Sequence, residues 1–380
     1  MPSNNRAFLI ASIIATRGIY GLNWYNMAPL YLAISSELSV RLGYLGLVPS
    51  SFLLGAALFQ LPAGLLAARY GAKRIAMLGM YMLGISTLLS GLARSLGALL
   101  ALRFLVGVGA ALYFSTAIRL LKDIFEARRE GLALGLYNAA FNLGAGIGVA
   151  GWALVAQLLG WRGSLILSGL AALAFTVEND IVLPRDPVVT TAKLRLALSR
   201  DVALLGLALA GFWGSYFAAS QYLHSYFVLK GRLDESSSAL ITSLVLFGGC
   251  VGGPLLGHIS DRVGRRRALL LAFTTALALS LALTPSYRGA LIPAYALLLG
   301  LTAGAIFSIM YAIPTGYEHV PGEVLPLALG LINAIQIALG SLIAFVFPLL
   351  AEVASFDLAW AALAAFALIP LPLLALVRER

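Results

Sequence analysis

Apolar runs of about 20 residues recur along the whole chain and are separated by short polar stretches. A run of this length crosses the roughly 30 Å hydrocarbon layer of a bilayer as an α-helix, and a helix satisfies its backbone hydrogen bonds within one segment. The pattern therefore predicts an all-α membrane protein with twelve transmembrane helices. The expected spans are 7–34, 43–68, 74–93, 95–119, 131–157, 161–183, 201–229, 238–260, 267–285, 289–316, 324–351 and 356–377.

Composition supports this prediction. Charged residues make up only 11% of the chain, against about 25% in soluble domains. The first apolar run continues past Arg17 without a small-residue cleavage site, so we expect a retained helix rather than a signal peptide. Cys250 is the single cysteine, which excludes an intrachain disulfide and a metal site built from several thiolates.

The net charge of +10 is explained by topology. If the N-terminus is cytoplasmic, 18 Lys and Arg residues fall in the inner loops and tails and six in the outer loops. Cytoplasmic loops of membrane proteins carry such an excess of basic residues. We therefore predict a multi-pass protein of the cell membrane with both termini in the cytoplasm, and we exclude nucleic-acid binding.

The sequence contains two similar halves offset by 193 residues. The segments "GLLAARYGAKR" (64–74) and "GHISDRVGRRR" (257–267) share one frame of glycines and basic residues. At the same offset, "GIYG" (18–21) matches "GFWG" (211–214). Agreement in register at several places indicates a duplicated unit rather than chance similarity in a sequence rich in Gly, Ala and Leu.

A further match, at an offset of 195, supports the duplication, since "LALGLYNA" from Leu132 is repeated as "LALGLINA" from Leu327. Parallel repeats of this kind place a substrate site between the two halves, near the middle of the membrane. The domains that we predict are a six-helix bundle over 1–183, a cytoplasmic linker over 184–200 and a second six-helix bundle over 201–380.

Three shorter motifs accompany the repeated loop segment. They are "RFLVGVG" at 103–109, "EARREGLALG" at 126–135 and "GWR" at 160–162. Together with the count of helices, these motifs resemble the major facilitator superfamily of secondary transporters. The resemblance implies two six-helix bundles that rock against each other, a small-molecule substrate and no cofactor. We expect a monomer in the lipid bilayer.

The loop segments supply the candidate gating residues. In the second copy Asp261 and Arg265 are four residues apart, the spacing of a local ion pair, and the resemblance implies a cytoplasmic latch. The first copy has Ala68 where the second has Asp261, so it lacks this acid. An alternative is that the basic residues only set topology. The candidate gating residues are Gly257, Asp261, Arg262, Gly264, Arg265, Gly64, Arg69 and Gly71.

Two arginines lie inside predicted spans. Arg17 lies ten residues into the first span and Arg103 eight residues into the fourth. A central arginine costs at least about 2.5 kcal/mol, so it usually faces a cavity or a partner. No acid lies at comparable depth, which predicts an anionic substrate that supplies the missing charge. For Arg103, a structural bond to helix carbonyls is the alternative.

Polar and aromatic side chains on the same helix faces complete the candidate binding site. Each of them also fits a packing role between helices. His224 lies in a predicted span and is a candidate for protonation, with a hydrogen-bonding role as the alternative. The sequence has no metal-binding spacing, phosphate-binding loop or nucleophile elbow, so we do not expect an enzyme. The remaining candidates are Tyr20, Trp24, Asn138, Asn142, Trp213, Tyr216, Gln221, Tyr311, Asn333 and Gln336.

These observations favour a secondary transporter of a small organic anion, with a carboxylate or phosphate group and a proton as the candidate coupling ion. The chain resembles the anion and proton symporters of the superfamily in pairing arginines on spans 1 and 4, but it has Thr16 and Ala110 where those members carry acids nearby. One alternative is drug efflux, although the fifth span lacks the Gly-Pro pair of drug antiporters. Another is a non-transporting sensor or a lipid scramblase.

Overall fold

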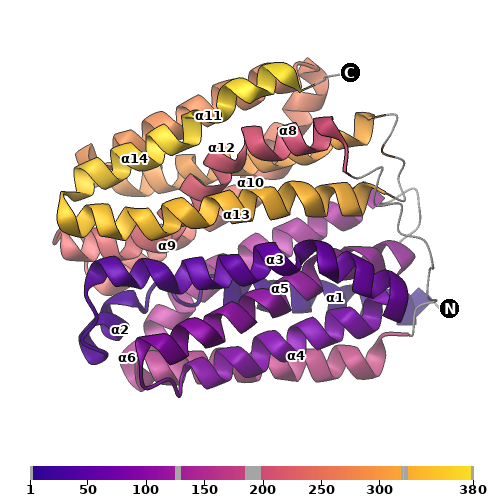
Figure 1. Cartoon of the computed structure of the whole chain (residues 1–380), viewed down its shortest axis with the longest axis horizontal. Helices are drawn as coiled ribbons and strands as arrows, with labels where there is room; N and C mark the ends of the chain where they lie inside the picture. Colours follow the sequence, from indigo (N-terminus) through magenta and orange to yellow (C-terminus); the bar gives the residue numbers. More distant parts are fainter. Residues whose placement is uncertain (1–2, 125–129, 185–197, 318–319, 321–323, 378–380) are drawn as a thin grey trace.

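The computed structural model describes residues 3–124, 130–184, 198–317, 320 and 324–377. Their regular structure is entirely helical (Figure 1), and no strand occurs among them. The first half, up to residue 183, contains α1 (Ser3–Trp24), α2 (Tyr31–Glu37), η1 (Leu42–Gly46), α3 (Leu47–Tyr70), α4 (Ala72–Ser90), α5 (Leu96–Ile124) and α6 (Glu130–Val182). The second half contains α8 (Arg200–Ala208), α9 (Ala210–Leu229), α10 (Glu235–Val263), α11 (Arg266–Ala282), η3 (Thr284–Ser286), α12 (Leu291–Ala312), η4 (Pro314–Gly316), α13 (Leu325–Val353), α14 (Phe356–Leu368) and η5 (Leu371–Leu376).

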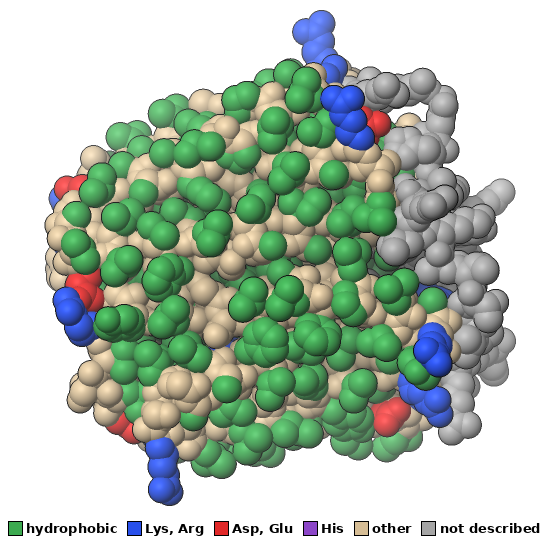
Figure 2. Space-filling model, viewed as in Figure 1, with side chains coloured by type: hydrophobic (Ala, Val, Ile, Leu, Met, Phe, Trp, Pro, Cys, Tyr) green, Lys and Arg blue, Asp and Glu red, His purple; other side chains and the backbone are tan. Residues whose placement is uncertain are grey.

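The long helices run side by side along the long axis of the molecule (Figure 1). Within the described residues, eight helical segments are long and apolar enough to cross a membrane. In Figure 2 hydrophobic side chains cover the flank of the visible face, while most of its charged side chains collect at the two ends of the bundle. This distribution is the one expected for a protein whose flank faces lipid.

The bend in α6 coincides with the boundary between the predicted spans 131–157 and 161–183. Gly160 has φ 67° there, a left-handed conformation that interrupts the helix. Trp161 Nε1 and Arg162 Nε donate to the Glu37 carboxylate at 2.6 and 2.7 Å. The hydrogen bonds from Arg162 and then Trp161 hold the pKa of Glu37 below its usual range. The "GWR" motif thus ties the bend to the end of α2.

The first predicted span is wrong in one respect. The pattern predicts one helix over 7–34, but α1 ends at Trp24 and a buried turn over 25–30 precedes α2. Pro29 disfavours helical geometry at the residue before it, and the Asn26 side chain bonds Ser168 rather than the local backbone. We call this turn the helix-1 break.

Helix contacts repeat between the halves at the offset seen in the sequence. A methyl group added at Gly55 of α3 would lie 2.2 Å from the Phe104 carbonyl oxygen of α5, and one at Gly248 of α10 would lie 2.7 Å from the Leu297 oxygen of α12. Both members of the first pair are 193 residues before those of the second. The duplicated sequence therefore forms a duplicated α3–α5 and α10–α12 packing. Between the halves, α3 packs against α13 and α6 against α10.

Candidate functional site

The side chain of Arg17 lies in a cage of four aromatic rings. It is only 3% exposed. The Arg17 Cζ atom lies 4.2 Å from the ring centre of Tyr137, 4.6 Å from those of Tyr20 and Phe141, and 5.3 Å from that of Phe114. The electron-rich ring faces stabilise a guanidinium ion, by roughly 2 kcal/mol or more where water is excluded. We call these four rings the Arg17 cage.

Glycines bring the helices of the cage together. A methyl group added at Gly144 of α6 would lie 1.9 Å from the Gly18 carbonyl oxygen of α1, and one at Gly21 would lie 2.3 Å from the Phe141 oxygen. The backbones of α1 and α6 are therefore in direct contact on either side of Arg17. This close approach sets Tyr137 and Phe141 of α6 over the guanidinium group.

No carboxylate among the described residues forms an ion pair with Arg17 or Arg103. The Nε and Nη1 atoms of Arg17 also have no hydrogen-bond partner among the described residues. Glu178, on α6, instead accepts a hydrogen bond from Ser12 at 3.0 Å, and Asp180 lies 3.8 Å from Lys73. The positive charge in the cage therefore has aromatic neighbours but no counter-ion.

Arg103 lies at the helix-1 break. Its Nη1 donates to Asn26 Oδ1 at 3.4 Å, and its Cζ lies 5.0 Å from the Phe52 ring centre. The Asn26 amide donates to Ser168 Oγ at 3.2 Å, and that hydroxyl donates to Asn23 Oδ1 at 3.0 Å. This buried network joins α5, α6 and the end of α1. The structure therefore does not bring Arg103 into the Arg17 cage.

Gln221 of α9 spans the helix-1 break from the second half. Its Nε2 donates to the Trp24 carbonyl oxygen at 3.2 Å, and its Oε1 accepts from the Tyr31 hydroxyl at 3.1 Å. The carbonyl at the end of α1 has lost its helical donor, so the amide of Gln221 satisfies it. One side chain thus links the residues on both sides of the break to the other half.

The aromatic candidates form contacts between the cage and the second half. Trp24 lies 5.8 Å from Tyr20 and 6.2 Å from Phe217 between ring centres. Trp213 stacks on Phe217 at 5.4 Å. Of the other two, Tyr216 packs edge-on against Phe307 at 5.7 Å, and Tyr311 stacks on Phe307 at 6.2 Å and lies within electrostatic range of Arg17.

The amide candidates are more scattered. Asn138 is exposed and Asn142 is half-buried, facing Gly249 of α10. Asn333 is buried, while Gln336 Nε2 lies 2.9 Å from Met310 Sδ. Asn138 and Asn333, which occupy equivalent positions in the repeated "LALGLYNA" and "LALGLINA" segments, therefore differ in exposure.

Three rings of the cage, Phe114, Tyr137 and Phe141, were not among the predicted site residues. Tyr137 and Phe141 are four residues apart, which places both on one face of a helix. That aromatic pair, on the helix predicted to face the substrate, was the available signal in the sequence.

Two glycines of the candidate gating segments have positive φ angles. Gly264 ends α10 in a left-handed conformation with φ 69°, and Gly71 has φ 92° between α3 and α4. A methyl group added at Gly257 would lie 2.3 Å from Ser308 Oγ, and one at Gly64 would lie 3.2 Å from Leu327 Cδ1. The basic candidates Arg69, Arg262 and Arg265 are exposed, and the side chain of Asp261 lies outside the described residues.

At the end of the bundle opposite the Gly71 and Gly264 turns, which we call the Glu352 end, polar contacts join the two halves. Glu352 pairs with Arg41 at 2.6 Å and also accepts from the Gly43 amide. His224 is buried on α9, and its Nε2 lies 3.2 Å from the Glu235 carbonyl oxygen, a hydrogen bond within the second half.

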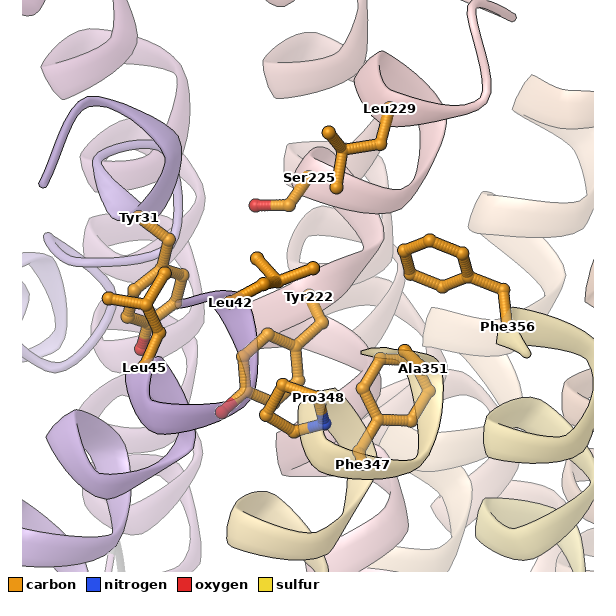
Figure 3. A pocket seen from close by; sticks show the side chains of 10 residues that line it. All are labelled: Tyr31, Leu42, Leu45, Tyr222, Ser225, Leu229, Phe347, Pro348, Ala351 and Phe356. Atoms are coloured by element: carbon orange, nitrogen blue, oxygen red, sulfur yellow. The ribbon is translucent and has the colours of Figure 1, made fainter. Parts of the chain in front are cut away.

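A small apolar hollow lies between the halves at this end (Figure 3). It has a volume of about 310 Å³, including space that is open to solvent. The lining residues are Tyr31, Leu42, Leu45, Tyr222, Ser225, Leu229, Phe347, Pro348, Ala351 and Phe356.

Comparison with known proteins supplies the remaining evidence. The sequence model of the Major Facilitator Superfamily matches residues 13–232 and 202–380. A probable sulfoacetate transporter of Cupriavidus necator is 27% identical over 61% of this chain and 60% of its own length. A 4-hydroxybenzoate transporter of Pseudomonas aeruginosa is 27% identical over 67% of this chain and 66% of its own. The chain thus spans less than two thirds of the length of the sulfoacetate transporter.

A solved structure shows the same fold. The crystal structure of a bacterial homologue of the human lysosomal transporter Spinster, in an inward-facing and occupied conformation, superposes with a TM-score of 0.75 at 17% identity. The superposition covers 99% of this chain and 97% of that one.

Proposed function

Since this chain belongs to the major facilitator superfamily, we propose that it is a secondary transporter of a small organic anion that works by alternating access. The observation that carries this proposal is the buried guanidinium of Arg17, which has two unpartnered nitrogens and no counter-ion within the described residues. A substrate carboxylate would supply the missing charge through charge-assisted hydrogen bonds. The family is one of transporters, so the chain is not an enzyme.

Two relatives support an anionic substrate. Their names assign them sulfoacetate and 4-hydroxybenzoate, which are both organic acids. The alternative of drug efflux would favour a cationic substrate, and neither of these substrates is cationic. The proposal also assigns the remaining candidate residues to the lining of the substrate path around the Arg17 cage. They include the amides Asn138, Asn142, Asn333 and Gln336.

The proposed topology has twelve spans, with six in 1–183 and six in 201–380, and both termini in the cytoplasm of a cell-membrane protein. The bend at Gly160 supports counting α6 as two spans. In this topology the Glu352 end faces outward, and the Gly71 and Gly264 turns face the cytoplasm. The bonds from Gln221 and Glu352 to the first half would then hold the outer side closed.

The closed outer side gives a testable expectation for Gln221. Gln221→Leu removes two hydrogen bonds between the halves, each worth about 1 kcal/mol, so the outward-open population should rise about 30-fold. The measurement is the rate at which a membrane-impermeant maleimide labels Ser225→Cys, which lies at the Glu352 end. The matched control is Gln60→Leu, since Gln60 is also buried and its Nε2 has no partner among the described residues. Equal labelling in both variants would contradict the assignment of Gln221.

Transport is tested with the purified full chain in proteoliposomes. We expect labelled organic anions to accumulate or exchange across the membrane, and an imposed pH gradient to change the rate if a proton is the coupling ion. A protein that binds an anion without moving it would instead be a sensor. Movement of fluorescent lipids without anion uptake would support a scramblase.

A further inference from the structure

The Arg17 cage continues into a layer of aromatic rings that crosses from one half to the other. Ring centres of Trp24 and Phe141 lie 5.9 Å apart and those of Trp24 and Phe217 lie 6.2 Å apart. Tyr25 lies 5.9 Å from Phe217 and 6.3 Å from Phe141. The guanidinium itself is surrounded by rings of α1, α5 and α6, and the layer extends from them to Phe217 on α9 of the second half.

The hydroxyls of the two tyrosines in the cage already have hydrogen-bond acceptors. Tyr20 donates to the Ala110 carbonyl oxygen at 3.2 Å, and Tyr137 donates to the Phe114 carbonyl oxygen at 3.2 Å. Beside the cage, the buried Tyr113 hydroxyl and Trp24 Nε1 have no partner among the described residues. The cage and its surroundings thus present mainly ring faces to a ligand, with few free donors. A ligand with many hydroxyl groups would leave some of them unpaired there, at a cost of about 1 to 3 kcal/mol for each buried group.

The cage also holds a single cation. The other buried arginine, Arg103, lies outside the cage at the helix-1 break, where it donates to Asn26 and packs on Phe52 and where its Nε has no partner among the described residues. A second carboxylate inside the cage would therefore lack a cation, and an unpaired buried charge is strongly unfavourable. One guanidinium in an aromatic enclosure fits a ligand with one negative charge.

We infer that the substrate is a planar aromatic monocarboxylate. Its carboxylate pairs with Arg17, and its ring lies among the aromatic side chains between the halves. This inference rests on the proposed function, because it names the class of anion that the same site accepts. Aromatic pairs contribute about 0.5 to 1.5 kcal/mol beyond the area that they bury, so ring stacking adds selectivity to the charge interaction.

The test compares the affinities of four carboxylates for the purified full chain, by tryptophan fluorescence or calorimetry at neutral pH. Benzoate should bind about tenfold more tightly than cyclohexanecarboxylate, which has similar size and the same charge but no flat ring. Gluconate tests the polyhydroxylated class, and isophthalate tests a second charge. Both should bind more weakly than benzoate by about 100-fold.

Two variants test which aromatic ring produces the preference for benzoate. Phe141→Leu should reduce the preference for benzoate over cyclohexanecarboxylate to less than about threefold, because one ring beside Arg17 is lost. Phe356→Leu, at the Glu352 end, should retain the full preference. Tighter binding of gluconate or isophthalate than of benzoate would overturn this inference while leaving anion transport intact. Failure of all four carboxylates to bind would overturn the proposed function and this inference together.

Discussion

Arg17→Gln is expected to weaken the binding of a carboxylate ligand by about 100-fold. A hydrogen bond to a charged group contributes about 1.5 to 3 kcal/mol, and about 1.4 kcal/mol corresponds to a tenfold change in affinity. Glutamine retains hydrogen-bond donors on a shorter side chain and removes the positive charge. The measurement is a calorimetric titration of wild type and variant with the carboxylate that binds wild type most tightly.

Two controls separate charge from stability. Arg94→Gln also removes one positive charge but does so at an exposed loop position, so its affinity should stay within about twofold of wild type. Arg17→Lys keeps the charge and loses the planar fork, so it should bind with intermediate affinity. Unchanged affinity in Arg17→Gln would contradict the assignment, whatever happens to its melting temperature.

Gly107→Leu is expected to lower the melting temperature of the protein by roughly 5 to 10 °C. A methyl group added at Gly107 of α5 would lie 1.9 Å from the Phe52 carbonyl oxygen of α3, so a leucine side chain would force the two backbones apart. Small residues allow such close approach between membrane helices. The measurement is thermal unfolding in detergent or lipid nanodiscs.

The matched control lies on the same helix. Gly97→Leu adds the same side chain where no atom lies within 4 Å of the added methyl group, so its melting temperature should change by no more than about 2 °C. Similar melting temperatures for the two variants would show that the α3–α5 contact does not limit stability. Gly300, 193 residues after Gly107, should behave as Gly107 does.

Local signals in the sequence predicted much of the fold. The turn at Gly264, the bend at Gly160 and the repeat of helix contacts at an offset of 193 residues all follow from glycine positions and internal similarity. The helix-1 break did not follow, because its residues belong to a continuous apolar run. Its stabilising partners, Arg103 and Gln221, lie far away in the sequence.

The candidate site, too, could be predicted only in part from the sequence. The depth of Arg17 and the lack of an acid at that depth could be seen from the sequence alone. Of its ring partners, Tyr20 was predicted and the Tyr137–Phe141 pair left a signal in the sequence. That Phe114 and Phe141 contact Arg17 could not be predicted, since they reach it only through the packing of α1, α5 and α6. The sequence likewise could not show that Arg103 bonds Asn26 at the helix-1 break, because that contact depends on the turn after Trp24.

The most direct test is a distance measured by solid-state NMR in lipid between a ¹³C-labelled substrate carboxylate and the ¹⁵N-labelled guanidinium groups. The Arg17→Lys variant identifies the signal that belongs to Arg17. We predict that the carboxylate carbon lies within about 4 Å of an Arg17 nitrogen, as in a charge-assisted hydrogen bond. A bound ligand whose dipolar coupling to arginine is absent, or persists unchanged in Arg17→Lys, would contradict the account.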